Sequence, residues 1–213
     1  MKIKVCGLKE PGNIQAVATL KPDYIGLICY ARSPRFIDDL QTEAFTDLPQ
    51  NIIKTGVFVN ESAEEIERLI DKYNLGAIQL HGSETPEFCA QFKGKVQVIK
   101  AFGVDENCDF NQLNAYAEVV DLFLFDTKTA AHGGSGKTFD WDILKNYTGN
   151  VPFMLSGGIG PENIAEAAAI SHPQFYGVDL NSRFETSPGI KNIEALQQAF
   201  NIVKKFDTHE IRS

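Results

Sequence analysis

A thiol and two carboxylic acids each come directly after a short apolar run of this chain, as Cys6, Asp126 and Asp179. Where such runs form the parallel strands of a barrel, the residues at the carboxyl ends of the strands face the active site. These three side chains are therefore candidates for chemistry, provided that the intervening segments bring the strand ends to one face of the same sheet.

Cys6 and Asp126 also have ordinary structural interpretations. A free cysteine is most often a small buried apolar side chain, and an aspartate after a strand often pins a loop. The position of Cys6 at a strand end, before Gly7, favours a reactive role. A carboxyl group at the rim of an apolar barrel is partly removed from water, which suits Asp126 to donate a proton. The two runs lie far apart around an eight-stranded ring, so their side chains can approach a substrate from opposite sides.

Two turns after the last two apolar runs predict a phosphate site. Gly157 and Gly158 lie in the first turn, and Asn181 and Ser182 follow Asp179 in the second. Barrels commonly bind phosphate after strands seven and eight through backbone N–H groups, and glycine lets the backbone approach the anion closely. One glycine-rich turn is weak evidence, but two turns at this pair of strand ends are a specific signal.

Arg35 and His81 are candidates for contacts to the rest of a substrate. Arg35 lies in a long predicted loop, where its guanidinium can grip a carboxylate bidentately, although most loop arginines are only solvated. His81 follows the run that ends at Leu80. A histidine there can hydrogen-bond a substrate or orient a neighbour, and a purely structural histidine is an equally good interpretation.

The elements that position these residues follow a regular alternation. Eight short runs rich in apolar and β-branched residues are separated by helical patterns, and most runs are continuously apolar, as a parallel sheet buried on both faces requires. The predicted fold class is α/β, a single-domain (β/α)8 TIM barrel with parallel strands, whereas an open doubly wound sheet would have fewer units. The predicted strands are Ile3–Cys6, Asp23–Ile28, Ile53–Val59, Gly76–Leu80, Val96–Ala101, Asp121–Asp126, Pro152–Ser156 and Phe175–Leu180.

The helical patterns fix the expected domain limits. Helices are predicted over Asn60–Tyr73, from Pro161 in a first turn, and over Ile190–Phe206. Residues 1–206 are expected to form the barrel, and residues 207–213 a polar C-terminal tail. The connections Cys29–Leu40 and Thr127–Asp140 are long, and the glycines at 133–136 in the second predict a flap over the barrel mouth.

Composition limits the class of protein. A chain of 213 residues with 43% hydrophobic content can bury a full core, and no apolar run approaches a membrane span. A net charge of -8 argues against nucleic acid and acidic lipid. The four cysteines are widely separated and show no metal-ligand spacing, so free thiols and a cytoplasmic location are expected. The oligomeric state stays open between monomer and homodimer.

The motifs, taken in order, resemble the phosphoribosylanthranilate isomerase family of tryptophan biosynthesis. Each motif is weak, but their shared order is specific and extends through nearly the whole chain. They are Lys4-Val5-Cys6-Gly7, Ser33-Pro34-Arg35, Gly56-Val57-Phe58-Val59, Gln79-Leu80-His81-Gly82, Asp126-Thr127, Gly133-Gly134-Ser135-Gly136, Phe139-Asp140-Trp141, Ser156-Gly157-Gly158-Ile159, Pro161-Glu162-Asn163 and Gly177-Val178-Asp179.

The resemblance implies an Amadori rearrangement of N-(5-phosphoribosyl)anthranilate, a small phosphorylated molecule, without a metal or organic cofactor. Carried over by position, Asp126 matches the family's general acid and Cys6 its general base, and Arg35 matches the arginine that holds the anthranilate carboxylate. The turns at 157–158 and 181–182 match its phosphate site. Lys9 is a possible stabiliser of a Cys6 thiolate.

One departure and two alternatives accompany this assignment. Arg183 stands where the family usually has glycine, so it either adds a phosphate contact or points to solvent. The first alternative is the related phosphosugar isomerase of the histidine pathway, which uses two aspartates, so that Cys6 argues against it. The second is a barrel that binds a phosphorylated ligand without catalysis, against which the joint presence of Cys6, Asp126 and Arg35 argues.

Overall fold

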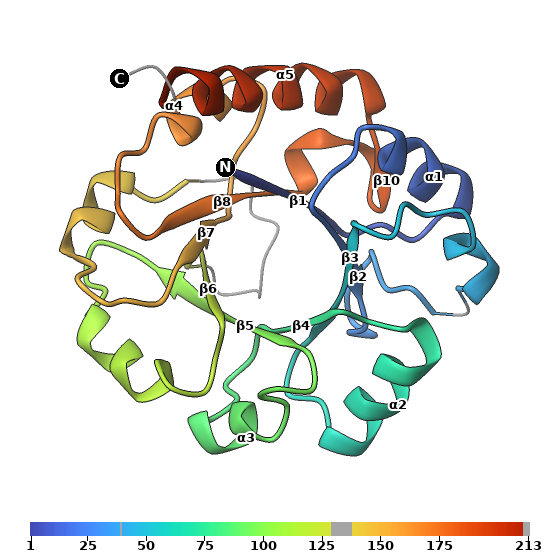
Figure 1. Ribbon diagram of the computed structural model, residues 1–213, viewed down its shortest axis with the longest axis horizontal. Helices are drawn as coiled ribbons and strands as arrows, with labels where there is room; N and C mark the ends of the chain where they lie inside the picture. The colour runs from blue at the N-terminus through green and yellow to red at the C-terminus, as the bar shows by residue number, and fades with distance from the viewer. Residues whose placement is uncertain (39, 129–137, 211–213) are drawn as a thin grey trace.

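Eight parallel strands pair in their order along the chain and close into a barrel, with β1 hydrogen-bonded to both β2 and β8. This computed structural model describes residues 1–38, 40–128 and 138–210, with side chains up to residue 206. Figure 1 shows the strands as an inner ring surrounded by helices. The predicted (β/α)8 barrel is therefore confirmed. Its strands are β1 Lys2–Cys6, β2 Tyr24–Ile28, β3 Ile53–Phe58, β4 Ala77–Leu80, β5 Gln97–Val104, β6 Leu122–Thr127, β7 Phe153–Leu155 and β8 Phe175–Leu180.

All eight predicted strands are present, and the end of β5 differs most from its predicted position. It continues to Val104, three residues past the expected end at Ala101. Gly103 suggests a strand end because glycine weakens strands. In the barrel, however, Gly103 pairs with Asp126 and Val104 with Thr127, so the ladder to β6 continues.

The outer layer is less helical than the sequence predicts. Within the described residues, the connections from β2 to β3, from β5 to β6 and from β6 to β7 hold only short 3₁₀ helices. The α-helices are α1 Pro11–Thr19, α2 Ala63–Tyr73, α3 Pro86–Ala90, α4 Ile164–Ala168 and α5 Ile193–Glu210, and the 3₁₀ helices are η1 Thr42–Phe45, η2 Phe110–Tyr116, η3 Trp141–Asn146 and η4 Ser182–Phe184.

Three predicted helix starts are wrong. Helix α2 begins at Ala63 rather than at Asn60, because the Ser62 side chain caps it by accepting a hydrogen bond from the Glu65 amide. Residues 190–191 form strand β10 (Ile190–Lys191), which pairs antiparallel with β9 (Glu185–Ser187), and α5 begins only at Ile193. Pro161 lies in a turn rather than in a first helical turn, because the Asn163 side chain accepts a hydrogen bond from the Gly160 amide at 2.8 Å and delays α4. At its other end α5 runs to Glu210, four residues past the expected boundary of the tail.

The barrel interior is apolar toward the amino ends of its strands, here called its lower part, and polar toward their carboxyl ends. Seven buried side chains fill its lower part: Tyr24, Ala77, Ile99, Ala101, Leu122, Leu124 and Met154. Strand residues two apart point to the same face. Gln79, Asp126 and Ser156 each lie two positions after one of these residues, so they stand above the apolar floor at the carboxyl ends of β4, β6 and β7. A larger apolar layer packs between the strands and the helices.

Two further observations bear on the predicted loops and on membranes. The expected flap at 133–136 lies outside the described residues. Among the helices that the structure describes, none has the length and apolar character to cross a bilayer.

Candidate active site

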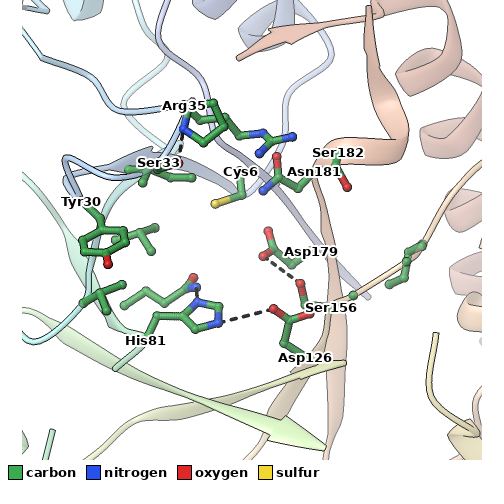
Figure 2. Close-up of a pocket in the computed structure, with 18 of the residues that line it drawn as sticks. Cys6, Tyr30, Ser33, Arg35, His81, Asp126, Ser156, Asp179, Asn181 and Ser182 are labelled. Atoms are coloured by element: carbon green, nitrogen blue, oxygen red, sulfur yellow. Dashed lines mark hydrogen bonds and ion pairs between the residues drawn. The ribbon is translucent and has the colours of Figure 1, made fainter. Parts of the chain in front are cut away.

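A cavity of about 440 Å³ opens at the carboxyl ends of the strands. Figure 2 shows side chains from several strands and loops pointing into it. The predicted catalytic and substrate-binding residues all contribute to its wall, although they come from five different strand ends and one long loop. They are Cys6, Arg35, His81, Asp126, Gly157, Gly158, Asp179, Asn181 and Ser182.

Cys6 occupies the end of β1 with its thiol against β2. An added Cβ at Gly26 would lie 2.6 Å from Cys6 Sγ, so only glycine leaves room for the thiol there. The side chain is 3% exposed. Burial raises the pKa of the Cys6 thiol above its ordinary value of 9.0, whereas the nearby Lys4 ammonium acts in the opposite direction. The thiol is therefore protonated at neutral pH in the free protein.

Lys4 lies two residues before Cys6 and shares its inward face. Its ammonium is fully buried and lies 3.0 Å from Asp179 Oδ1. Burial disfavours the ammonium, but the Asp179 carboxylate and the Cys6 side chain raise the pKa of Lys4. Lys9, which the sequence suggested as a thiolate stabiliser, instead donates to the Pro34 carbonyl at 2.8 Å. Lys4 is thus the ammonium beside the thiol.

Asp126 ends β6 across the cavity from Cys6 (Figure 2). Its Oδ1 accepts a hydrogen bond from the Thr127 amide at 2.8 Å, and its Oδ2 lies 3.4 Å from His81 Nε2. Gln79 Nε2 is 2.9 Å from His81 Nδ1. The Gln79 amide donates to Nδ1, so the neutral ring carries its proton on Nε2 and directs it at Asp126. His81 thus orients the Asp126 carboxylate.

Both carboxylate oxygens of Asp179 are bonded to other side chains. Oδ1 pairs with Lys4, and Oδ2 accepts a hydrogen bond from Ser156 Oγ at 3.3 Å. Burial raises the pKa of the Asp179 carboxyl, and Lys4 opposes that shift. Its position in the cavity wall, with both oxygens engaged, fits a residue that fixes the floor beside Cys6.

Arg35 reaches the cavity from the loop after β2. Its guanidinium forms a bidentate pair with Glu185, with Nε at 2.9 Å from Oε1 and Nη2 at 2.7 Å from Oε2. Gly7 beneath it has φ +77°, and an added Cβ there would lie 2.7 Å from Arg35 Cδ and from Asn181 Oδ1. Glycine at position 7 therefore lets Arg35 and Asn181 pack directly on the chain after β1.

The turn after β7 presents two unpaired backbone donors. Gly157 has φ +84° and Gly158 has φ +67°, both in the left-handed region that favours glycine. The amide N–H of neither residue donates to an acceptor among the described residues. Such groups at a cavity wall suit an anion. Arg183, by contrast, pairs with Glu162 on the exposed surface and does not line the cavity.

Three residues that contact the predicted site residues were not themselves predicted from the sequence. Lys4 carried a signal, because its spacing of two from Cys6 puts both side chains on one strand face. Glu185 and Lys191 carried none, because they lie in the β9–β10 hairpin, which was not predicted and whose second strand was expected to begin a helix. Within the described residues, no three His, Cys, Asp or Glu side chains are arranged to hold a metal ion.

Comparison with known proteins agrees with this geometry. A family model described as N-(5'phosphoribosyl)anthranilate (PRA) isomerase matches residues 3–202. A relative named N-(5'-phosphoribosyl)anthranilate isomerase, from Parabacteroides distasonis, is 47% identical over 200 residues, which cover 92% of this chain and 90% of that protein.

Solved structures agree as well. The phosphoribosyl anthranilate isomerase of Thermotoga maritima superposes with a TM-score of 0.86 at 33% identity, covering 96% of this chain and 99% of that chain. A second isomerase structure, solved in complex with reduced 1-(o-carboxyphenylamino)-1-deoxyribulose 5-phosphate, has a TM-score of 0.83 at 29% identity, with coverage of 96% and 99%.

Proposed function

Because the chain belongs to the N-(5'-phosphoribosyl)anthranilate isomerase family, we propose that Asp126 and Cys6 are the general acid and the general base of that reaction here. The family assignment supplies the reaction: N-(5-phosphoribosyl)anthranilate is converted to 1-(2-carboxyphenylamino)-1-deoxyribulose 5-phosphate in tryptophan biosynthesis. The observation that carries the proposal is the placement of both groups on facing walls of one cavity.

Asp126 is the group placed to open the sugar ring. Its proton passes to the furanose oxygen while the bond from that oxygen to C1 breaks, and the nitrogen lone pair forms the C1–N double bond of a Schiff base. His81 and the Thr127 amide hold the carboxyl group in one orientation for this transfer. A positioned acid of this kind contributes roughly 10²–10⁴-fold to the rate.

Cys6 is the group placed to remove the C2 proton. The iminium at C1 makes that proton acidic, the electrons of the broken C–H bond form an enolamine, and tautomerisation gives the ketone. A thiolate is required for this step. The Lys4 ammonium below Cys6 stabilises the thiolate, and it is itself held in place by Asp179.

The two ends of the substrate have separate binding groups. Arg35 is assigned to the carboxylate of the anthranilate ring, because its guanidinium forms part of the cavity wall. The backbone at Gly157 and Gly158, with Asn181 and Ser182 of the next turn, is assigned to the phosphate. The net charge of -8 makes such local donors necessary for a substrate that carries two anionic groups.

The cellular setting follows from the same chemistry. All four cysteines are free, which fits a reducing compartment, so we assign the protein to the cytoplasm. The isomerase of Thermotoga maritima, of which monomeric variants have been solved, is dimeric. For this chain the assignment stays at monomer or homodimer.

The test is the loss of anthranilate fluorescence when freshly generated phosphoribosylanthranilate meets the purified protein. Cys6→Ala and Asp126→Asn are each expected to lower kcat on the order of 10²-fold or more. Cys108→Ala and Asp142→Asn, which change a thiol and a carboxylate outside the cavity, serve as matched controls and should match wild type. Near-normal turnover in Cys6→Ala or in Asp126→Asn removes that residue from its assigned role.

A further inference from the structure

Glu185 holds one edge of the Arg35 guanidinium. Nε of Arg35 lies 2.9 Å and 3.0 Å from the two Glu185 carboxylate oxygens, and Nη2 lies 2.7 Å from Oε2. A guanidinium has five N–H donors in a planar fork, so the edge that carries Nη1 is left for a second acceptor. Within the part of the chain that the structure describes, no other side chain is bonded to this guanidinium.

Glu185 is itself fixed by the hairpin that carries it. Oε1 accepts hydrogen bonds from Lys191 Nζ at 2.6 Å and from the Gly189 amide at 3.1 Å. The side chains of Glu185 and Lys191 are 4% and 0% exposed. Burial disfavours the carboxylate, but Arg35 and Lys191 together lower the pKa of Glu185, so it stays ionised. The carboxylate is therefore a rigid and charged support.

Lys191 ties this support to the rest of the site. Its ammonium also donates to Asn181 Oδ1 at 2.8 Å, and its backbone amide and carbonyl are both bonded to the Asn13 side chain, at 2.7 Å and 2.9 Å. Figure 2 shows Arg35 and Asn181 side by side on the cavity wall. The hairpin after β8 thus fixes a guanidinium that comes from the loop after β2.

The charges of this cluster suit an anionic ligand. Burial lowers the pKa of Lys191, and the Glu185 carboxylate opposes that shift. When the Lys191 ammonium is charged, Arg35, Lys191 and Glu185 together carry one net positive charge in a chain whose formal net charge is -8. Arginine loses much rotamer freedom when it binds a ligand, and a support that fixes it beforehand removes that entropy cost from binding.

We propose that Glu185 is a positioning residue, which orients Arg35 so that its free edge binds the carboxylate on the aromatic ring of the substrate. This inference rests on the carboxylate-binding role proposed above for Arg35. Glu185 makes no contact with the substrate in this arrangement, and Lys191 acts one step further away by holding Glu185.

The test measures the affinity of two probes by calorimetry. The first is reduced 1-(o-carboxyphenylamino)-1-deoxyribulose 5-phosphate, and the second is the same molecule without its ring carboxylate. Glu185→Gln is expected to weaken binding of the first probe by about tenfold, the effect of a lost charged hydrogen bond, and to leave binding of the second unchanged. A variant with a damaged fold would instead bind both probes more weakly.

A double-mutant cycle then asks whether Glu185 acts through Arg35. In an Arg35→Ala background, Glu185→Gln should have no further effect on the carboxylated probe, because the group that it orients is gone. An equal effect in both backgrounds overturns the proposal. So does an unchanged or tightened affinity in Glu185→Gln, which would mean that Glu185 competes with the substrate for Arg35.

A second variant guards against a fold defect. Glu185→Gln leaves Lys191 buried without its carboxylate, so it is paired with Glu185→Gln/Lys191→Met, which removes both charges. In both variants, the ratio between the affinities for the two probes should be smaller than in wild type. If Arg35→Ala binds the two probes as wild type does, the proposed function of Arg35 fails and this inference fails with it. If Arg35→Ala loses discrimination and the Glu185 variants keep it, only this inference fails.

Discussion

His81 Nε2 lies 3.4 Å from Asp126 Oδ2, so that a side chain at the end of β4 contacts the acid at the end of β6. Gln79 fixes the far nitrogen of the ring at 2.9 Å. Strand β5 lies between β4 and β6 in the barrel, so this contact joins the ends of two strands that are not neighbours. It sets the direction of the Asp126 carboxyl group.

Replacing His81 should reduce turnover less than replacing the acid itself. We expect His81→Asn to lower kcat by about tenfold, because it loosens the orientation of Asp126 but leaves the proton donor in place. In an Asp126→Asn background the same change should have no further effect on kcat. Steady-state kinetics of the three variants check this. A loss in His81→Asn as large as in Asp126→Asn would show that His81 is more than an orienting residue.

The pH dependence of the rate should report Cys6. Burial raises the pKa of the Cys6 thiol above 9.0, so the thiolate fraction in the free enzyme increases with pH through the alkaline range. In Asp126→Asn, which has no titrating acid at that position, we expect the residual kcat/KM to rise with pH from neutrality until that pKa is reached, since only the thiolate accepts the C2 proton. A profile that is flat from pH 7 to pH 10 would contradict a thiolate base.

The ion pair of Lys4 and Asp179 should be costly to break on one side only. Lys4→Met leaves the Asp179 carboxylate buried without its partner, and we expect it to lower the free energy of unfolding by about 3 kcal/mol. Lys4→Met/Asp179→Asn should recover much of that loss, because it leaves no uncompensated charge. Urea unfolding of both variants gives the comparison. Equal losses in the single and double variants would show that packing, not charge, decides the stability here.

The same pair gives an alkaline stability limit. The folded-state pKa of Lys4 is raised above its ordinary value of 10.5, so its ammonium stabilises the native state fully below pH 10.5. That contribution is lost as the pH rises through the folded-state pKa. The free energy of unfolding of wild type should therefore fall above pH 10.5 more steeply than that of Lys4→Met/Asp179→Asn. Parallel curves for the two proteins would contradict the raised pKa.

Gly157 should be indispensable for the position of the acid. An added Cβ there would lie 2.5 Å from Asp126 Oδ1 and from the Thr127 amide, and φ is +84°. Gly157→Ala is expected to lower both the melting temperature and kcat. Gly94→Ala is the matched control, because φ is +81° and nothing lies within 4 Å. It should cost only about 1 kcal/mol of backbone strain and leave kcat unchanged. Equal kinetics for the two variants would refute the steric argument.

Arg183 should matter little for phosphate binding. Its side chain is 42% exposed and pairs with Glu162, which is 52% exposed, and neither lines the cavity. Exposed pairs contribute little, so Arg183→Gly is expected to change KM by no more than about twofold. Steady-state kinetics in phosphate-free buffer, at two ionic strengths, test this. A tenfold rise in KM would place Arg183 at the phosphate after all.

Local sequence patterns were sufficient for the strands and for the residues at their ends. Continuous apolar runs identify buried parallel strands because both faces of such a strand are covered. Once eight runs close a ring, Cys6, Asp126 and Asp179 are placed together by the geometry of the barrel alone. Helices were predicted less well, since connections such as η1 and η2 need only a short 3₁₀ helix to cover the strands.

Strand patterns and motifs predicted nine of the residues that line the cavity, whereas the packing of the folded chain sets what each of them contacts. The pairing of Arg35 with Glu185, 150 positions away, depends on a hairpin that no periodicity marks. The choice of Lys4 over Lys9 beside Cys6 depends on which way two side chains point. Strand positions follow from local hydrophobicity and a period of two, but ion pairs between loops follow only from the packing of the whole chain.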